Sequence, residues 1–171
     1  MLTHLAATLP LRTWVLARVD GDEVLVLAAA GDGAAASRGS AFRWSGSLSA
    51  GMVEAGVRAA PSLADVPALR DAVPVRDGSV GAYLGVPVCR PDGTMWGVLA
   101  GVAPGPVAVD LDEHTPTVEL FARLLGGILA AGLRAAAGDR EHDRRRIADM
   151  HDPITGLGDR DFWDRVLGAE E

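Results

Sequence analysis

Apolar and polar positions follow strand periods in two blocks of the chain, and each block predicts a hairpin. Apolar, β-branched runs cover residues 13–19 and 23–29, with an Asp-Gly-Asp turn between them. A second pair of runs covers residues 80–88 and 94–102 and is joined by a Pro-Asp-Gly turn. We therefore expect two antiparallel hairpins.

Helical spacing is found near both ends of the chain. Residues 2–9 predict a short helix that ends near Pro10. A long helix is predicted from Thr115 as N-cap, with Pro116 at the first helical position, where a missing N–H costs nothing. The pre-proline position Asp152 should end it. Its apolar residues form two tracks: Val118, Phe121, Leu125 and Ile128, and then Leu129, Leu133 and Ala136.

The segment between the hairpins, residues 34–79, is less regular. Within it, residues 47–55 predict a short helix capped by Ser45 or Ser47, and one helical turn is predicted near 66–72. A long irregular insertion in a compact domain is often a binding element. The order of elements predicts an α+β fold: an antiparallel sheet flanked by helices, with a long C-terminal helix.

Composition limits the functions that the chain can have. Hydrophobic residues make up 49%, enough for a core, and the net charge of -7 argues against a nucleic-acid surface. The single cysteine, Cys89, excludes an internal disulfide and fits a reducing cytoplasm. Residues 124–133 are too short an apolar run to span a bilayer, and the N-terminus lacks a charged leader. We expect a cytoplasmic bacterial protein, since an Ala/Gly/Arg-rich chain without Asn or Lys looks actinobacterial.

Residues 152–160 read Asp-Pro-Ile-Thr-Gly-Leu-Gly-Asp-Arg. They resemble the Asp-x-(Leu/Ile)-Thr-Gly-Leu-x-(Asn/Asp)-Arg motif that opens GGDEF domains, the catalytic part of diguanylate cyclases. The resemblance implies that the full-length protein is a diguanylate cyclase. The family's Gly-Gly-Asp/Glu-Glu-Phe loop does not occur here, so no catalytic or metal-binding residue is carried over and this chain is expected not to be an enzyme. The alternative is a turn followed by a C-terminal helix.

A second resemblance covers about residues 3–137 by the usual tolerance on boundaries. The strand Gly-Ala-Tyr-Leu-Gly-Val-Pro-Val at 81–88, the Pro-Asp-Gly turn and Trp-Gly-Val-Leu at 96–99 resemble the core of GAF domains, and residues 42–53 look like a bacterial GAF subgroup. The chain then divides into a GAF-like sensor domain at 1–137, a helical linker at 138–151 and the truncated start of a GGDEF domain at 152–171.

The GAF resemblance raises the question of a cofactor, and we predict none. Cyclic-nucleotide-binding members carry an Asn-Lys-x-Phe-Asp-Glu motif, and this chain has no Asn. Bilin attachment needs a cysteine followed closely by histidine, but Cys89 has no His nearby. None of the four histidines falls in the 34–79 segment, where a haem ligand would be needed. One cysteine also cannot supply the internal disulfide of the methionine-sulfoxide-reducing members.

A sensor of this kind would have its cavity between the sheet and the 34–79 segment. We predict that Phe42, Trp44, Met52 and Tyr83 border it and that Asp65 supplies a polar group. Small strand residues leave room for a mostly apolar or planar small molecule. In the alternative interpretation the glycines accommodate helix packing and the aromatic side chains fill the space themselves.

The apolar tracks on residues 118–136 exceed what one sheet face can cover, so we predict a parallel homodimer through this helix. Polar residues at Arg140 and Asp143 should loosen the seam further along. Together the two resemblances imply the regulatory sensor module of a cyclic di-GMP signalling protein, which binds a small molecule, dimerises, or does both to control the catalytic domain. The alternative is a ligand-free dimerisation module with no sensory role.

Overall fold

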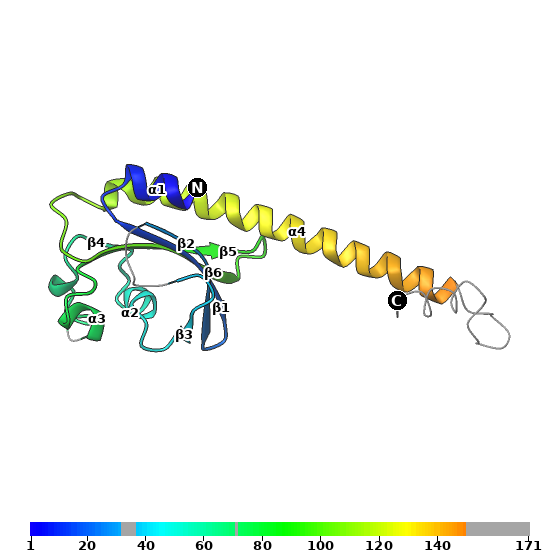
Figure 1. Cartoon of the computed structure of the whole chain (residues 1–171), viewed down its shortest axis with the longest axis horizontal. Helices are drawn as coiled ribbons and strands as arrows, with labels where there is room; N and C mark the ends of the chain where they lie inside the picture. The colour runs from blue at the N-terminus through cyan, green and yellow to red at the C-terminus, as the bar shows by residue number, and fades with distance from the viewer. Residues whose placement is uncertain (32–36, 71, 150–171) are drawn as a thin grey trace. The chain divides into compact units, whose positions relative to one another are not determined.

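The two hairpins form the centre of one antiparallel sheet of six strands, in the order β3-β2-β1-β6-β5-β4 (Figure 1). This computed structural model describes residues 1–31, 37–70 and 72–149. The strands are β1 Thr13–Asp20, β2 Glu23–Gly31, β3 Ala41–Arg43, β4 Ala59–Ala60, β5 Ala82–Cys89 and β6 Met95–Ala103. The predicted α+β class is confirmed, and pairing of β1 with β6 joins the hairpins.

The residues fall into two compact units, Met1–Ile128 and Leu129–Glu171, and the sheet belongs to the first. The predicted start of a GGDEF domain, residues 152–171, lies outside the described residues, as does the predicted helix end at Asp152. The side chains of Arg140 and Asp143 are also outside the described part, so the predicted loosening of the seam stays a prediction.

Each hairpin turn depends on a glycine with positive φ. Gly21 has φ 60° between β1 and β2, and Gly93 has φ 83° between β5 and β6. Side chains with a Cβ rarely adopt this conformation. In the second turn the Asp92 carboxylate also accepts hydrogen bonds from Thr94, from its backbone nitrogen at 2.9 Å and its hydroxyl at 2.6 Å.

Helices cover both faces of the sheet. Figure 1 shows α1 and the start of α4 along one face, with α2 and α3 on the other. The bounds are α1 Leu2–Thr8, α2 Leu48–Glu54, α3 Val73–Arg76 and α4 Thr115–Asp149, with short 3₁₀ turns η1 Leu63–Asp65 and η2 Asp112–His114. No helix in the described ranges is long and apolar enough to cross a membrane.

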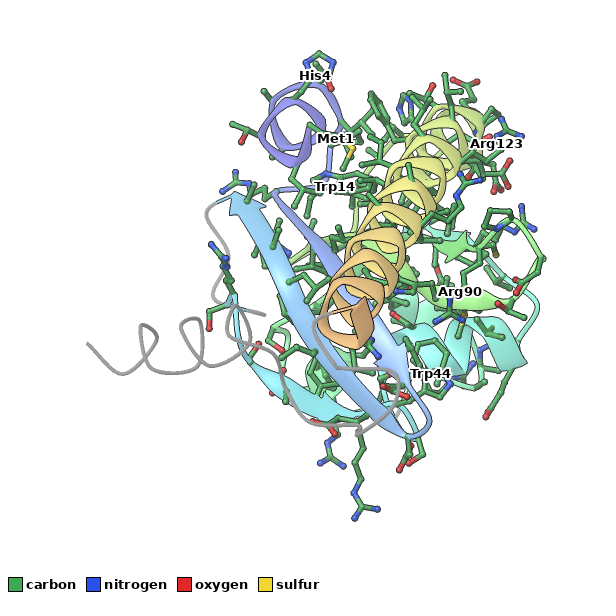
Figure 2. The ribbon with its side chains drawn as sticks, turned by 90° about the vertical axis from the view of Figure 1, so that its right-hand side faces the viewer. Met1, His4, Trp14, Trp44, Arg90 and Arg123 are labelled. Carbon is green, nitrogen blue, oxygen red and sulfur yellow. The ribbon has the colours of Figure 1, made fainter. Side chains whose placement is uncertain are left out.

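A different set of side chains fills each face. Trp14 is fully buried, and its indole N–H donates to the Leu11 carbonyl at 3.1 Å. Figure 2 places Trp14 on the α1 side of the sheet and Trp44 on the opposite side. On that opposite side Met52, Leu63 and Tyr83 belong to one buried cluster, against which Trp44 packs partly exposed. This second face carries the residues predicted to form a site.

One local prediction needs correction. Thr115 is not an N-cap: it has helical torsions, and its hydroxyl donates to the Leu111 carbonyl at 3.5 Å instead of accepting from the helix. The reason is the preceding turn η2, which α4 continues without a break. The helical turn predicted near 66–72 is present, since the Arg70 nitrogen donates to the Val66 carbonyl at 3.1 Å, and α3 follows it. Ser47 caps α2, since its Oγ accepts from the Ala50 nitrogen at 3.1 Å.

Candidate functional site

A cavity of about 300 Å³ lies between α2 and the sheet. Of the five predicted site residues it brings together three: Trp44 from the segment between β3 and α2, Met52 from α2, and Tyr83 from β5. The remaining wall is mostly apolar and consists of Ser49, Val53, Gly56, Val57, Arg58, Gly85, Val86, Pro87, Met95 and Val98.

Tyr83 is held in the cavity wall by two neighbours. Its hydroxyl donates to Ser49 Oγ at 2.8 Å, which ties β5 to α2. Its side chain lies over Gly85, two residues on and therefore on the same face of the strand. A Cβ at position 85 would overlap the Tyr83 hydroxyl. Glycine at 85 is thus what lets the ring lie flat along β5, in keeping with close approach at strand glycines.

Burial raises the pKa of Tyr83 to about 12, against an opposing effect of the hydrogen bond to Ser49. The ring is only 3% exposed, so ionisation would place a phenolate among apolar side chains. At physiological pH Tyr83 is therefore a neutral hydroxyl in the cavity wall.

Ionisation of Tyr83 should destabilise the protein at alkaline pH. An unfolded tyrosine loses its proton near pH 10 and the folded one near 12, so the stabilisation is complete below about pH 10 and is lost as pH rises toward 12. The difference corresponds to roughly 2–3 kcal/mol. Because Tyr83 is the chain's one tyrosine, near-ultraviolet absorbance of tyrosinate reads it directly. The alkaline loss of stability should shrink in Tyr83→Phe, and a native titration near pH 10 would contradict the buried geometry.

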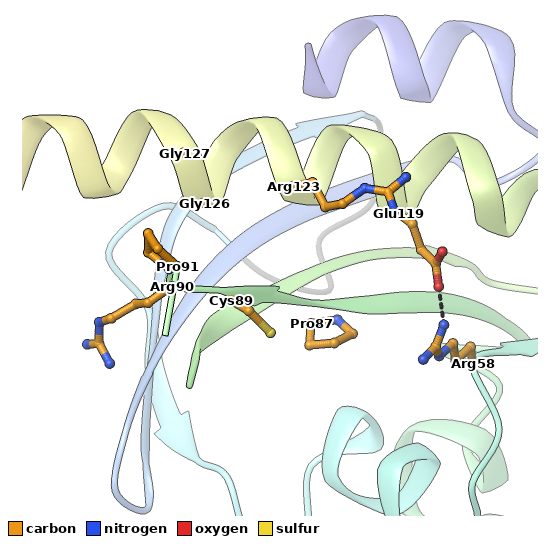
Figure 3. Close-up of a pocket in the computed structure, with 9 residues that line it drawn as sticks. All are labelled: Arg58, Pro87, Cys89, Arg90, Pro91, Glu119, Arg123, Gly126 and Gly127. Atoms are coloured by element: carbon orange, nitrogen blue, oxygen red, sulfur yellow. Dashed lines mark hydrogen bonds and ion pairs between the residues drawn. The ribbon is translucent and has the colours of Figure 1, made fainter. Parts of the chain in front are cut away.

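A second hollow, of about 400 Å³, lies where the end of β5 meets α4 (Figure 3). The Arg58 guanidinium forms an ion pair with the Glu119 carboxylate across it. Gly126 of α4 sits against the Cys89 carbonyl so closely that a Cβ there would overlap the oxygen. Cys89 is half-buried, and in Figure 3 its side chain points toward Pro87.

The structural comparisons find the same architecture in several proteins. The chromophore-binding domain of an unusual bacteriophytochrome from R. palustris matches with a TM-score of 0.60 and 17% identity, over 79% of this chain and 54% of that chain. The GAF domain of an Acinetobacter phosphoenolpyruvate-protein phosphotransferase gives 0.59 and 17%, over 80% and 82%. The phycocyanobilin-bound GAF domain of a cyanobacterial phytochrome gives 0.56 and 16%, over 76% and 80%.

The fold is that of a GAF domain. At these identities the likeness concerns the fold alone, and this chain spans about half the length of the bacteriophytochrome domain. No protein-family model matches the sequence, and neither does any curated protein. The GAF resemblance inferred from the strand motif is thereby supported at the level of the fold.

Two of the predicted site residues lie away from the cavity. Phe42 is 45% exposed on the edge strand β3 and borders a shallow depression with Asp22 and Arg43. Asp65 is exposed in η1. Phe42 pairs with Val24 of β2 at the edge of the sheet, and it does not reach the cavity wall.

The cavity also contains residues that the sequence analysis did not single out. Ser49 lies three residues before Met52, so helical spacing alone puts both on one side of α2 and could have indicated it. No comparable pattern in the sequence indicated that Arg58 would line the cavity. The histidines of the compact unit, His4 and His114, do not line the cavity. No group of three or more His, Cys, Asp or Glu in the described ranges could hold a metal ion.

The strand glycines are explained mainly by close packing. A Cβ at Gly97 would overlap the Ala17 carbonyl, and one at Gly81 would overlap backbone at Gly105. Of Gly81, Gly85 and Gly97, only Gly85 lines the cavity. Tyr83 and Trp96 lie toward opposite ends of the β5–β6 hairpin: Tyr83 pairs with Val102, while Met95, next to Trp96, pairs with Cys89.

Proposed function

We propose that this GAF domain is a cytoplasmic sensor whose cavity between α2 and the sheet binds a small, mostly apolar molecule. The observation that carries the proposal is the cavity itself, bordered by Trp44, Met52 and Tyr83 where those side chains could instead have closed on one another. A space of about 300 Å³ is at the lower end of the range for small-molecule sites.

The chemistry of the wall limits the ligand. Aromatic and aliphatic side chains supply most of it, which favours a planar apolar body. The hydroxyls of Ser49 and Tyr83 already bond to each other, leaving lone pairs and the serine proton to orient a ligand's polar group. The domain has no catalytic role in this proposal.

The signal would leave through α4. Leu120, Leu124 and Ile128 are 50%, 55% and 68% exposed and follow one another at intervals of four residues, so they form one stripe on the helix. Val118 and Ala122 are buried in the domain. We infer that, in a parallel homodimer, this stripe packs against the same stripe of a second copy.

The regulated domain, in this proposal, is a diguanylate cyclase that begins near Asp152. Its support is the sequence resemblance of residues 152–160. A cyclase that joins two GTP molecules needs two catalytic domains facing each other, which a parallel helix pair would provide. A ligand in the sensor domain can shift the helix pair between two arrangements only by the difference in its affinity for those arrangements. The alternative is a ligand-free dimerisation module.

Native mass spectrometry of freshly purified protein distinguishes a ligand-binding sensor from a ligand-free dimerisation module. We expect a small molecule that is released on denaturation, and we expect Val53→Trp to lose it. Val53 is 63% exposed at the rim, so the larger ring should fill the mouth without disturbing the core. A native dimer mass of twice the polypeptide mass with nothing added, together with no thermal stabilisation by planar apolar compounds, would favour the dimerisation module.

A further inference from the structure

Arg58 borders both hollows of the GAF domain: the cavity beside Tyr83 and the depression against α4. We propose that the molecule bound in the cavity is a planar apolar anion, and that its acid group takes Arg58 away from Glu119 of α4. The inference rests on the proposed function and adds the charge of the ligand and its route to the helix.

The backbone of Arg58 is fixed by a hydrogen bond, while its side chain is exposed and held by the ion pair with Glu119. The Arg58 carbonyl accepts from the Gly85 nitrogen at 2.9 Å, which holds the residue beside the floor of the cavity. Its side chain is 58% exposed and extends toward α4 (Figure 3). Rotation about side-chain bonds is enough to bring the guanidinium to the cavity mouth, because the stem is long and flexible.

Arg58 is the one charged side chain among the residues that line the cavity. Once released from Glu119, its guanidinium is the charged group of the wall that can reach a ligand at the mouth. A cationic ligand would be repelled, and a neutral one would leave the guanidinium unused. An acid group would accept paired hydrogen bonds from it, the geometry that guanidinium groups favour.

Glu119 is the group that such an anion would replace. It lies one turn into α4, is partly buried, and holds Arg58 through one guanidinium nitrogen. Among the described residues this ion pair is the one that joins the segment before β4 to α4. A partly exposed ion pair contributes little to stability, so exchanging its carboxylate for that of a ligand costs little. By linkage, removing the competing Glu119 carboxylate should strengthen anion binding by the same factor by which the bound anion weakens the Arg58–Glu119 pair.

The test compares 2-naphthoate with 2-naphthamide, which share size and ring and differ in charge. Calorimetric titration of the wild-type protein should show naphthoate binding roughly tenfold more tightly, as expected for a charge-assisted hydrogen bond. Glu119→Gln should improve naphthoate affinity by about two- to fivefold, because the competing exposed pair is weak. Naphthamide affinity should not change in this variant.

Two arginine variants complete the design. Arg58→Gln should remove the preference for naphthoate. Arg123→Gln is the matched control, since Arg123 borders the depression on α4 but not the cavity, and it should keep the preference. Figure 2 shows Arg123 on the outside of α4.

The outcomes distinguish this inference from the function on which it rests. Equal binding of both probes, blocked by Val53→Trp and indifferent to residues 58 and 119, would overturn the anion exchange and leave the sensory cavity standing. A preference that depends on Arg123 instead of Arg58 would also overturn it. Binding of neither probe would count against both proposals.

Discussion

Replacing Leu124 by glutamate should convert the proposed homodimer to monomer. Leu124 is 55% exposed and lies midway along the stripe, between Leu120 and Ile128. Burying a leucine side chain contributes about 1.5–3 kcal/mol, and in a symmetric pair each substitution acts twice, so the dimer dissociation constant should rise about 100-fold or more. Two facing carboxylates would repel as well. Light scattering and sedimentation across the micromolar range measure the change.

Val109→Glu is the control for this prediction. Val109 is 44% exposed and lies in the segment before η2, outside the α4 stripe, so the same change of chemistry should leave assembly intact. If Val109→Glu dissociated the dimer equally, the surface around η2 would be the interface. A wild-type protein that is monomeric throughout the micromolar range, with or without the downstream domain, would end the dimer proposal.

The stripe also shows how far helical spacing can be followed from sequence. The pattern placed Val118 and Ile128 on one track, yet Val118 is fully buried and Ile128 is 68% exposed. The buried partner of Val118 is Ala122, four residues on, which a search for large apolar residues passes over. An ideal helix turns about 100° per residue, so positions ten apart, such as 118 and 128, point in clearly different directions.

Strands could be predicted where local pattern and turn chemistry agreed. Both hairpins have long apolar runs around Gly-containing turns, and they occur in the structure as β1–β2 and β5–β6. The edge strands β3 and β4 have three and two residues. Segments this short show no measurable period, and pairing with β2 and β5 defines them. Only the tertiary structure supplies that information.

The same limit applies to the site. Met52 and Tyr83 were predicted on elements with a clear period, a helix at 47–55 and a strand at 80–88, and they line one cavity together with Trp44 from the irregular segment. Phe42 and Asp65 lie in the irregular segment, where no period says which way a side chain points. The Arg58–Glu119 pair joins residues 61 positions apart and leaves no mark in the sequence. Ligand binding by this cavity remains a prediction.

Alanine should have opposite effects on stability at two adjacent glycines of α4, Gly126 and Gly127. Gly126 is buried against the Cys89 carbonyl, whereas Gly127 is exposed and a Cβ there would meet nothing within 4 Å. Alanine stabilises an exposed helix interior by about 1 kcal/mol relative to glycine, and Gly127→Ala should gain about that amount. Gly126→Ala gains the same propensity but forces a Cβ into strand backbone.

The backbone at Cys89 cannot move aside as a flexible side chain would, because it is the last residue of β5 and pairs with Met95 of β6. Overpacking typically costs 1–3 kcal/mol, and a backbone contact belongs at the upper end, so Gly126→Ala should be destabilised by roughly 1–3 kcal/mol overall. Urea unfolding followed by tryptophan fluorescence measures both variants. The comparison belongs in the Leu124→Glu background at one protein concentration, since dimerisation would otherwise shift apparent stability. If Gly126→Ala were as stable as Gly127→Ala, α4 would not be seated on the end of β5, and the depression that Arg58 and Glu119 border would lose its wall.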